Sequence, residues 1–122
     1  MSDLNNKSLN LVDMSVLQSL KAYARSPAFM PQLVGIFEEH GRSSLIELRM
    51  ALSDQDVESV RRVAHRFKGS CLNMGAQALA GELKLLEAFS PDTKWPIDRV
   101  ETTYHDLTQL FDTTCNYLKS LN

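Results

Sequence analysis

The residues best suited to chemistry lie in the middle of the chain, in the stretch Ala64-His65-Arg66-Phe67-Lys68-Gly69-Ser70. If this stretch is helical, residues three or four positions from His65 share its face, and three of them, Arg61, Arg62 and Lys68, are basic. Positive charges near an imidazole disfavour its protonated form, which leaves a ring nitrogen free to act as a nucleophile. The same charges would stabilise an anionic group attached to that nitrogen.

Gly69 is the second unusual feature, because glycine inside a helix costs about 1 kcal/mol relative to alanine. It follows His65 by four residues and leaves the helix surface beside the imidazole open, so that a phosphoryl group or a loop of a partner could approach the backbone. A histidine, nearby cations and an open helix surface together predict a phosphoryl acceptor. A simpler interpretation, in which the basic residues form only a solvated face, is the default for charged side chains.

The remaining candidate residues predict no second site. The three histidines, His40, His65 and His105, have no HxxxH or ExxH spacing to a second ligand, so we expect no metal site. Cys71 and Cys115 form no CxxC or CxxH motif, and their positions on or beside apolar stripes favour structural roles. Leu72 is either peripheral core or part of an exposed docking patch.

Length and composition indicate one globular domain over residues 1–122, with 43% apolar and 23% charged residues. The net charge of −2 argues against a broad basic footprint for nucleic acid and against a polybasic membrane surface. No basic N-terminal region leads into an apolar stretch, and nowhere do eighteen apolar residues follow one another. We therefore expect a monomeric cytoplasmic protein, and the start at Met1 favours a stand-alone protein over a domain cut from a larger kinase.

Apolar residues recur at helical spacing along almost the whole chain, and no stretch alternates as a half-buried strand would. A first helix is predicted over 13–24, capped by Asp13, with an apolar side of Val16, Leu17, Leu20 and Tyr23 or Ala24. A longer helix is predicted over 28–52, although Pro31 leaves open a start at that residue. Gly41 lies on its apolar stripe and marks either close helix packing or a bend.

A third helix is predicted after the capping residues Ser53 and Asp54, ending near Gly75. Its seam consists of Val57, Val60, Ala64, Phe67, Cys71 and Met74. His65 follows Ala64, so it is rotated by about 100° from this seam and is expected to be exposed.

Two further helices are predicted toward the C-terminus. The fourth has an apolar stripe of Ala76, Leu79, Leu83 and Leu86 and ends at the turn Ser90-Pro91-Asp92. The fifth begins near Pro96, after Trp95, which is expected to be a packing anchor or partly exposed. Its seam is Ile97, Val100, Tyr104, Leu107, Phe111, Thr114, Leu118 and Leu121.

Short connections favour antiparallel neighbours, so we expect an all-α protein. The predicted architecture is an up-and-down antiparallel four-helix bundle over about residues 28–121. An additional N-terminal helix would cover one end or side, and residues 1–12 would be flexible.

The segment 64–70, followed by Gly75-Ala76 and Leu86-Glu87, closely resembles the histidine-containing phosphotransfer (HPt) domain. That family has the pattern A-H-x-L-K-G-S, with G-A ten residues after the histidine, and the resemblance covers essentially the whole chain. Phe67 and Cys71 replace a common leucine and a common small residue. Both lie on the core seam, so these departures concern packing and not chemistry.

The resemblance implies that His65 is phosphorylated on its outer ring nitrogen, that Lys68 contacts the phosphoryl group, and that Gly69 leaves room for it. Arg61, Arg62 and Ser70 are candidate supporting residues. Glu87 is a candidate acceptor for a hydrogen bond from the inner ring nitrogen, because some family members carry glutamine near this position.

The resemblance also implies partners, namely receiver domains of a hybrid histidine kinase and of a response regulator, whose aspartates exchange the phosphoryl group with His65. The chain has no Gly-rich phosphate loop and no evident acidic metal pocket, so the partner would supply Mg²⁺ and most of the catalysis. The protein would then be a phosphocarrier without a cofactor of its own rather than an enzyme. The alternative is a non-phosphorylated helical binding module that docks receiver domains or other partners.

Overall fold

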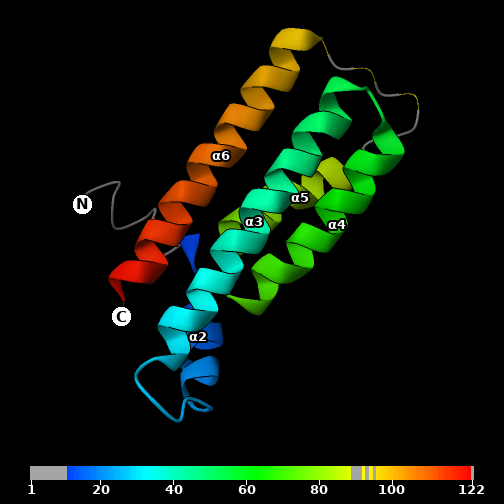
Figure 1. The fold of residues 1–122 in the computed structure, drawn as a ribbon. Coiled ribbons are helices and arrows are strands. Elements are labelled where there is room, and N and C mark those ends of the chain that lie inside the picture. The colour runs from blue at the N-terminus through cyan, green and yellow to red at the C-terminus, as the bar shows by residue number, and fades with distance from the viewer. Residues whose placement is uncertain (1–10, 89–91, 93, 95, 122) are drawn as a thin grey trace, which may run out of the picture.

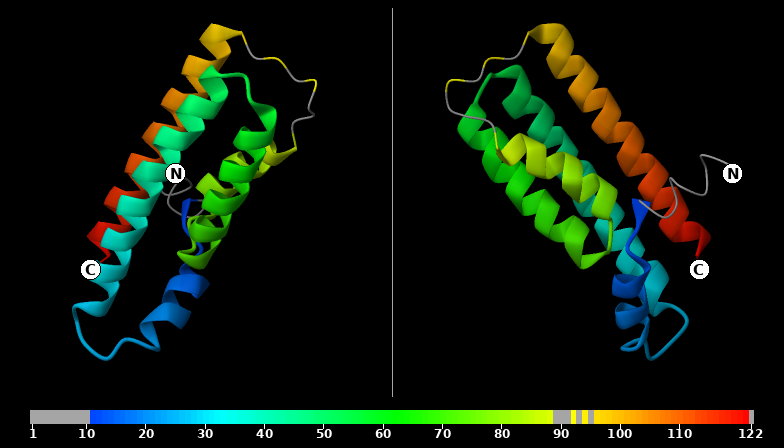
Figure 2. Two further views of the ribbon diagram at one scale, coloured as in Figure 1. Left: turned by 45° about the vertical axis from the view of Figure 1, so that its right-hand side comes forward. Right: turned by 180° about the vertical axis from the view of Figure 1, so that it is seen from behind.

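The computed structural model describes residues 11–88, 92, 94 and 96–121, and no strand occurs within them. Its helices are α2 (Met14–Lys21), α3 (Phe29–Ser53), α4 (Val57–Asn73), α5 (Gln77–Glu87) and α6 (Ile97–Ser120). α3 packs on α4 and α6, and α5 packs on the same two helices, which closes a ring of four antiparallel helices (Figure 1). α2 lies at one end of this ring, beside the start of α3 (Figure 2). The predicted all-α bundle with an additional N-terminal helix is confirmed.

Among the described residues, α3, α4 and α6 each contribute one buried phenylalanine ring to the core. The ring centroids of Phe37 and Phe111 are 5.8 Å apart, and those of Phe67 and Phe111 are 6.0 Å apart. Gly41 lies against Phe111, and a Cβ atom at position 41 would overlap that ring. The glycine on the α3 stripe therefore serves close helix packing, and α3 continues through it as one helix.

Both cysteines belong to the same core, as free thiols. Burial raises the pKa of the Cys71 thiol, and burial likewise raises the pKa of the Cys115 thiol to about 12. Because the thiolate is the reactive form of cysteine, neither residue is poised for chemistry at neutral pH. Their burial agrees with the predicted structural roles.

The start of α4 differs from the prediction. α3 runs through Ser53, and Asp54 is its C-cap, so neither residue caps α4. Asp56 takes that role, and its carboxylate accepts a hydrogen bond from the backbone N–H of Ser59 at 3.2 Å. Gln55 has a φ of 57°, and this left-handed residue turns the chain between the two helices.

The first two helices also differ in detail from the prediction. α3 begins at Phe29, so Pro31 is its third residue. The N–H groups of a first helical turn have no partner within the helix, so a proline there removes no hydrogen bond. α2 ends at Lys21; of the two alternatives for the end of the apolar side, Tyr23 is 78% exposed and is ruled out, whereas Ala24 is half-buried.

The chain before α2 is fixed to the turn between α4 and α5. Gly75 ends α4 with a φ of 75°, as predicted, and its carbonyl accepts a hydrogen bond from the N–H of Asp13 at 2.7 Å. Leu11 and Val12 are buried, which contradicts the predicted flexibility for these two residues of the segment 1–12. Residues 1–10, the Ser90-Pro91 part of the predicted turn and Trp95 lie outside the described residues. None of the described helices has the length and hydropathy needed to cross a membrane.

Candidate functional site

α4 turns its apolar seam inward and leaves His65 on its outer face. Ala64 and Phe67 are buried, whereas the side chain of His65 is 77% exposed, which confirms the expected exposure. Side chains on a helix point back toward its N-terminus, so the imidazole lies over the turn that contains residues 61 and 62.

Glu87, the last residue of α5, connects the two functional side chains of α4. Its Oε1 atom lies 2.5 Å from Nδ1 of His65, and its Oε2 atom lies 2.6 Å from Nζ of Lys68. The side chains of Lys68 and Glu87 are only 21% and 18% exposed, so this bridge is partly shielded from water. The prediction that Glu87 contacts the inner ring nitrogen agrees with this geometry.

The bridge determines the chemistry that the imidazole can perform. The hydrogen bond from Lys68 lowers the pKa of Glu87; burial opposes this effect in part, and the contact with His65 lowers the pKa further. Glu87 is therefore ionised at neutral pH and accepts the proton carried by Nδ1. The lone pair of a neutral imidazole then resides on Nε2, the other nitrogen of this largely exposed side chain.

The cationic surroundings of His65 are less simple than the sequence suggested. Positive charges were expected around the imidazole, whereas the group in direct contact with the ring is the Glu87 carboxylate. Lys68, predicted to contact a phosphoryl group, contacts Glu87 here. The Glu87 carboxylate thus contacts both the Lys68 ammonium and the imidazole.

Arg61 and Arg62 lie on the N-terminal side of the imidazole. Nε of Arg61 donates a hydrogen bond to the backbone carbonyl of Glu87 at 3.1 Å, and Nη2 of Arg62 lies 3.4 Å from Oγ of Ser59. These two arginines, His65 and Glu87 line an open hollow of about 480 Å³. Glu58 lines it as well, and this residue was missed by the sequence analysis, although its position seven residues before His65 places it on the same helix face.

The other predicted site residues of α4 have different surroundings. Gly69 is exposed, and a Cβ atom there would meet nothing within 4 Å, so the fold itself does not require glycine at this position. Ser70 is half-buried and lines a separate hollow with His40, so the structure does not bring it to His65. Leu72 is 52% exposed, which favours the docking patch over the peripheral core.

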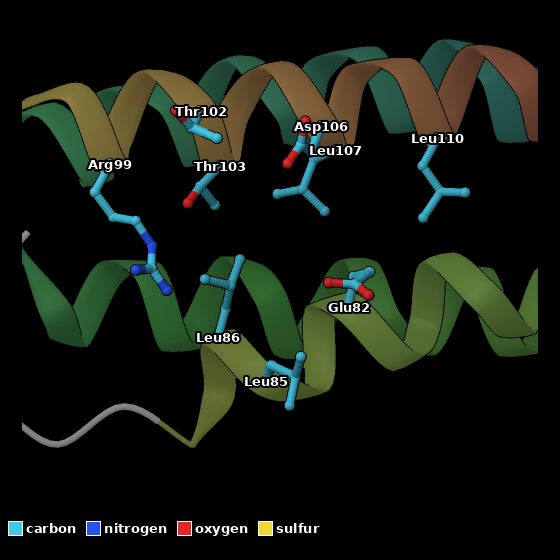
Figure 3. A pocket seen from close by; sticks show the side chains of 9 residues that line it. All are labelled: Glu82, Leu85, Leu86, Arg99, Thr102, Thr103, Asp106, Leu107 and Leu110. Carbon is cyan, nitrogen blue, oxygen red and sulfur yellow. The ribbon is translucent and has the colours of Figure 1, made fainter.

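A larger hollow of about 580 Å³ lies on another face, between α5 and α6 (Figure 3). Leu85 and Leu86 of α5 face Leu107 and Leu110 of α6 there, and the lining includes no histidine or cysteine. Among the residues that the structure describes, no group of three or more histidine, cysteine, aspartate or glutamate side chains is arranged to hold a metal ion. The larger hollow therefore offers no histidine or cysteine nucleophile, and the candidate site remains the face of α4 around His65.

Comparisons with known proteins agree with this assignment. Residues 32–115 match the family model described as the Hpt domain, which is more than half of the chain. The chain belongs to the HPt family. The matched range includes all of α4 and α5, and with them the contact between His65 and Glu87.

A solved HPt structure is similar over nearly the whole chain. It is the crystal structure of histidine-containing phosphotransfer protein B (HptB) from Pseudomonas aeruginosa PAO1, with 29% sequence identity and a TM-score of 0.77. The match covers 92% of this chain and 94% of that protein. Comparison with the curated proteins gave no match. The family and the structural match support a histidine phosphotransfer role in a phosphorelay for this HPt protein.

Proposed function

We propose that this HPt protein is a phosphocarrier in which Nε2 of His65 accepts a phosphoryl group from an aspartyl phosphate and later returns it to another aspartate. The observation that carries this proposal is the exposed imidazole whose Nδ1 atom is 2.5 Å from the Glu87 carboxylate. This contact leaves Nε2 as the nucleophile, in agreement with the expected use of the outer ring nitrogen.

The transfer step requires no change in the position of the Nδ1 proton. The Nε2 lone pair attacks phosphorus, an N–P bond forms, and the bond between phosphorus and the aspartyl oxygen breaks, so that its electrons return to the carboxylate. The imidazole ring becomes positively charged in this step. Glu87 stabilises that charge through its contact with Nδ1, in the way a carboxylate supports a catalytic imidazolium. The reverse step uses the protonated ring as the leaving group.

Lys68 and Gly69 have supporting roles in this proposal. The Lys68 ammonium, held by Glu87, orients that carboxylate, and its position three residues after His65 on α4 would let it interact with a phosphoryl group. Gly69 leaves the surface beside the ring open for the loop that carries the partner's aspartate. The exposed Leu72, two turns beyond His65, would contribute to docking the partner.

The proposed partners are the receiver domains of a hybrid histidine kinase and of a response regulator. The carrier itself is proposed to be a monomeric cytoplasmic protein. Phosphoryl transfer requires in-line geometry and charge neutralisation by metal ions and positioned cations. We assign the Mg²⁺ ion, the acceptor carboxylate and most of the catalysis to the receiver. In this scheme the HPt protein is a carrier rather than an enzyme and needs no cofactor of its own.

The test is to mix the purified protein with a phosphorylated receiver domain and Mg²⁺. The expected product is a protein-bound phosphate that is labile in acid and stable in alkali, and it should be absent from His65→Gln. His40→Gln and His105→Gln are matched controls, because each removes an exposed imidazole outside the hollow at His65. Unimpaired labelling of His65→Gln would refute the proposal, and a stable complex without transfer in either direction would favour the binding module.

A further inference from the structure

We propose that Arg61 and Arg62 bind the phosphoryl group carried by His65 and so increase the fraction of phosphoryl that remains on this protein. This inference rests on the proposed function, since it presupposes a phosphoryl group on Nε2. It adds two binding residues on the N-terminal side of the imidazole to Lys68 and Gly69 on the C-terminal side.

The hollow beside the imidazole is the first observation behind this inference. His65 lines it together with Arg61 and Arg62, whereas Lys68 and Gly69 do not. The His65 side chain points toward the turn that carries the two arginines. A phosphoryl group attached to its exposed end therefore enters a space that is bordered by two guanidinium groups.

The second observation is that Lys68 is already engaged. Its ammonium lies 2.6 Å from the Glu87 carboxylate, which balances much of its charge. A phosphoryl group carries roughly two negative charges at neutral pH, and one shared ammonium does not neutralise them. Guanidinium groups bind phosphoryl oxygens through two parallel N–H donors, which suits Arg61 and Arg62 to this task.

The arginines differ in how firmly they are held. The hydrogen bond from Nε of Arg61 to the Glu87 carbonyl fixes its guanidinium against the C-terminal end of α5 and leaves its two terminal nitrogens for a ligand. Arg62 has a longer contact, 3.4 Å to the Ser59 hydroxyl, which a charged ligand can readily replace. Arg61 is thus a preorganised contact and Arg62 an adaptable one.

Two carboxylates line this hollow; Glu87 is engaged by Lys68 and His65, so the one that mainly opposes a bound anion there is Glu58. Its carboxylate lines the same space and repels a phosphoryl group there. Because Lys68 balances the charge of Glu87, the two guanidinium groups outweigh the negative charge of Glu58. Glu58→Gln should therefore strengthen phosphoryl binding, whereas Arg61→Ala and Arg62→Ala should weaken it.

The chain provides a matched control in Arg66, which lies four residues after Arg62 on the same helix. Its guanidinium pairs with Glu47 of α3, and it is not part of the hollow. Arg66→Ala therefore removes the same charge from α4 without removing a proposed phosphoryl contact. Thermal unfolding of each unphosphorylated variant separates a loss of stability from a loss of phosphoryl binding, which matters most for Arg61 because of its contact with α5.

The experiment uses the full chain, phosphorylated on histidine with potassium phosphoramidate, and follows the ³¹P NMR signal of the phosphohistidine with pH. Nearby cations lower the pKa of the phosphoryl group, so Arg61→Ala and Arg62→Ala should each raise its titration midpoint by about 1 unit. Arg66→Ala should leave the midpoint unchanged, and Glu58→Gln should lower it. In a parallel assay with a phosphorylated receiver, both arginine variants should show a smaller equilibrium fraction of phosphoryl on His65.

The outcomes separate this inference from the proposed function. If wild-type His65 is labelled by the receiver but the arginine variants titrate like the wild type, the arginines do not bind the phosphoryl group and the inference is wrong. Equal shifts in Arg66→Ala and Arg62→Ala would likewise overturn it, because they would show only an effect of net charge. If the receiver does not label His65 of the wild type at all, it is the proposed function that fails.

Discussion

Replacing Gly69 with alanine should make this HPt protein more stable and a poorer phosphoryl acceptor. Gly69 lies within α4, where a glycine costs about 1 kcal/mol relative to alanine. A Cβ atom at this position meets nothing within 4 Å, so no steric penalty offsets the gain. For a domain of 122 residues, this gain corresponds to a rise of about 4 °C in the unfolding midpoint.

The same methyl group should obstruct the partner. It lies on the face of His65, four residues along the helix, and points back toward the imidazole. A receiver that must retreat or tilt to avoid it loses in-line alignment, and a cost of about 1.4 kcal/mol in the transition state slows transfer about tenfold. Phosphoramidate is a small donor that needs no docked protein, so the rate at which it labels Gly69→Ala should change much less than the rate of transfer from a receiver.

The assay compares Gly69→Ala with Gly35→Ala, in which the substituted residue is also an exposed helical glycine whose added Cβ meets nothing within 4 Å. Thermal unfolding should show a similar gain for both variants, and rapid-quench transfer from a phosphorylated receiver should be slow for Gly69→Ala alone. Wild-type transfer rates in Gly69→Ala would refute the argument that this glycine exists for the partner. A loss of stability in Gly69→Ala would refute the argument that the fold does not need it.

Three further predictions follow from other contacts. Gly41→Ala should lower the free energy of unfolding by about 1–3 kcal/mol, because the added methyl group overlaps the Phe111 ring. Chemical denaturation measures this free energy, and a wild-type value would contradict the close packing of Gly41 on Phe111. Glu87→Gln should keep the contact with Nδ1 but remove the charge that stabilises the phosphorylated ring, so the rate of phosphoryl transfer from a receiver should fall about tenfold. The control is Glu82→Gln, on the other side of α5, which should transfer at the wild-type rate. The hydrogen bonds from Lys119 to Glu38 and from Lys68 to Glu87 lower the pKa of each carboxyl group below 4.5. These two contacts therefore contribute fully to stability above that pH, and the contribution is lost as the pH falls through the lowered pKa values of the folded protein. The thermal midpoint should therefore fall steeply with acidification below about pH 4.5, and less steeply in Glu38→Gln; an equal slope in both proteins would contradict this assignment.

The helical bundle and the exposure of His65 were predictable because both depend on local periodicity. The seam of α4 recurs every three or four residues, so the inward direction of Ala64 and Phe67 also fixes the outward direction of His65. Gly75 ended its helix as expected, because a left-handed residue is one of the strongest local signals in a sequence.

The cap of α4 could not be chosen from the sequence alone. Ser53, Asp54 and Asp56 are all residue types that cap helices, and they lie within four positions of one another. The left-handed backbone of Gln55 decides between them, because it lets α3 extend through Ser53 before the chain turns. A non-glycine residue in that conformation leaves little trace in the sequence.

The roles of the charged residues depended on how α4 packs against its neighbours. Spacing from His65 predicts the face on which Arg62 lies, but not that Arg66 pairs with Glu47 of α3. The contact between Glu87 and His65 likewise depends on the register of α5 against α4, which the buried core sets. Such contacts between helices are not encoded in the spacing of either helix alone.

The most direct test of this account is to identify the atom that carries the phosphoryl group after transfer from a phosphorylated receiver. NMR of protein labelled with ¹⁵N in its histidine rings resolves both the residue and the ring nitrogen. We expect the phosphoryl group on Nε2 of His65, with the proton retained on Nδ1 beside Glu87. A phosphoryl group on Nδ1 of His65, or on His40 or His105, would contradict the account.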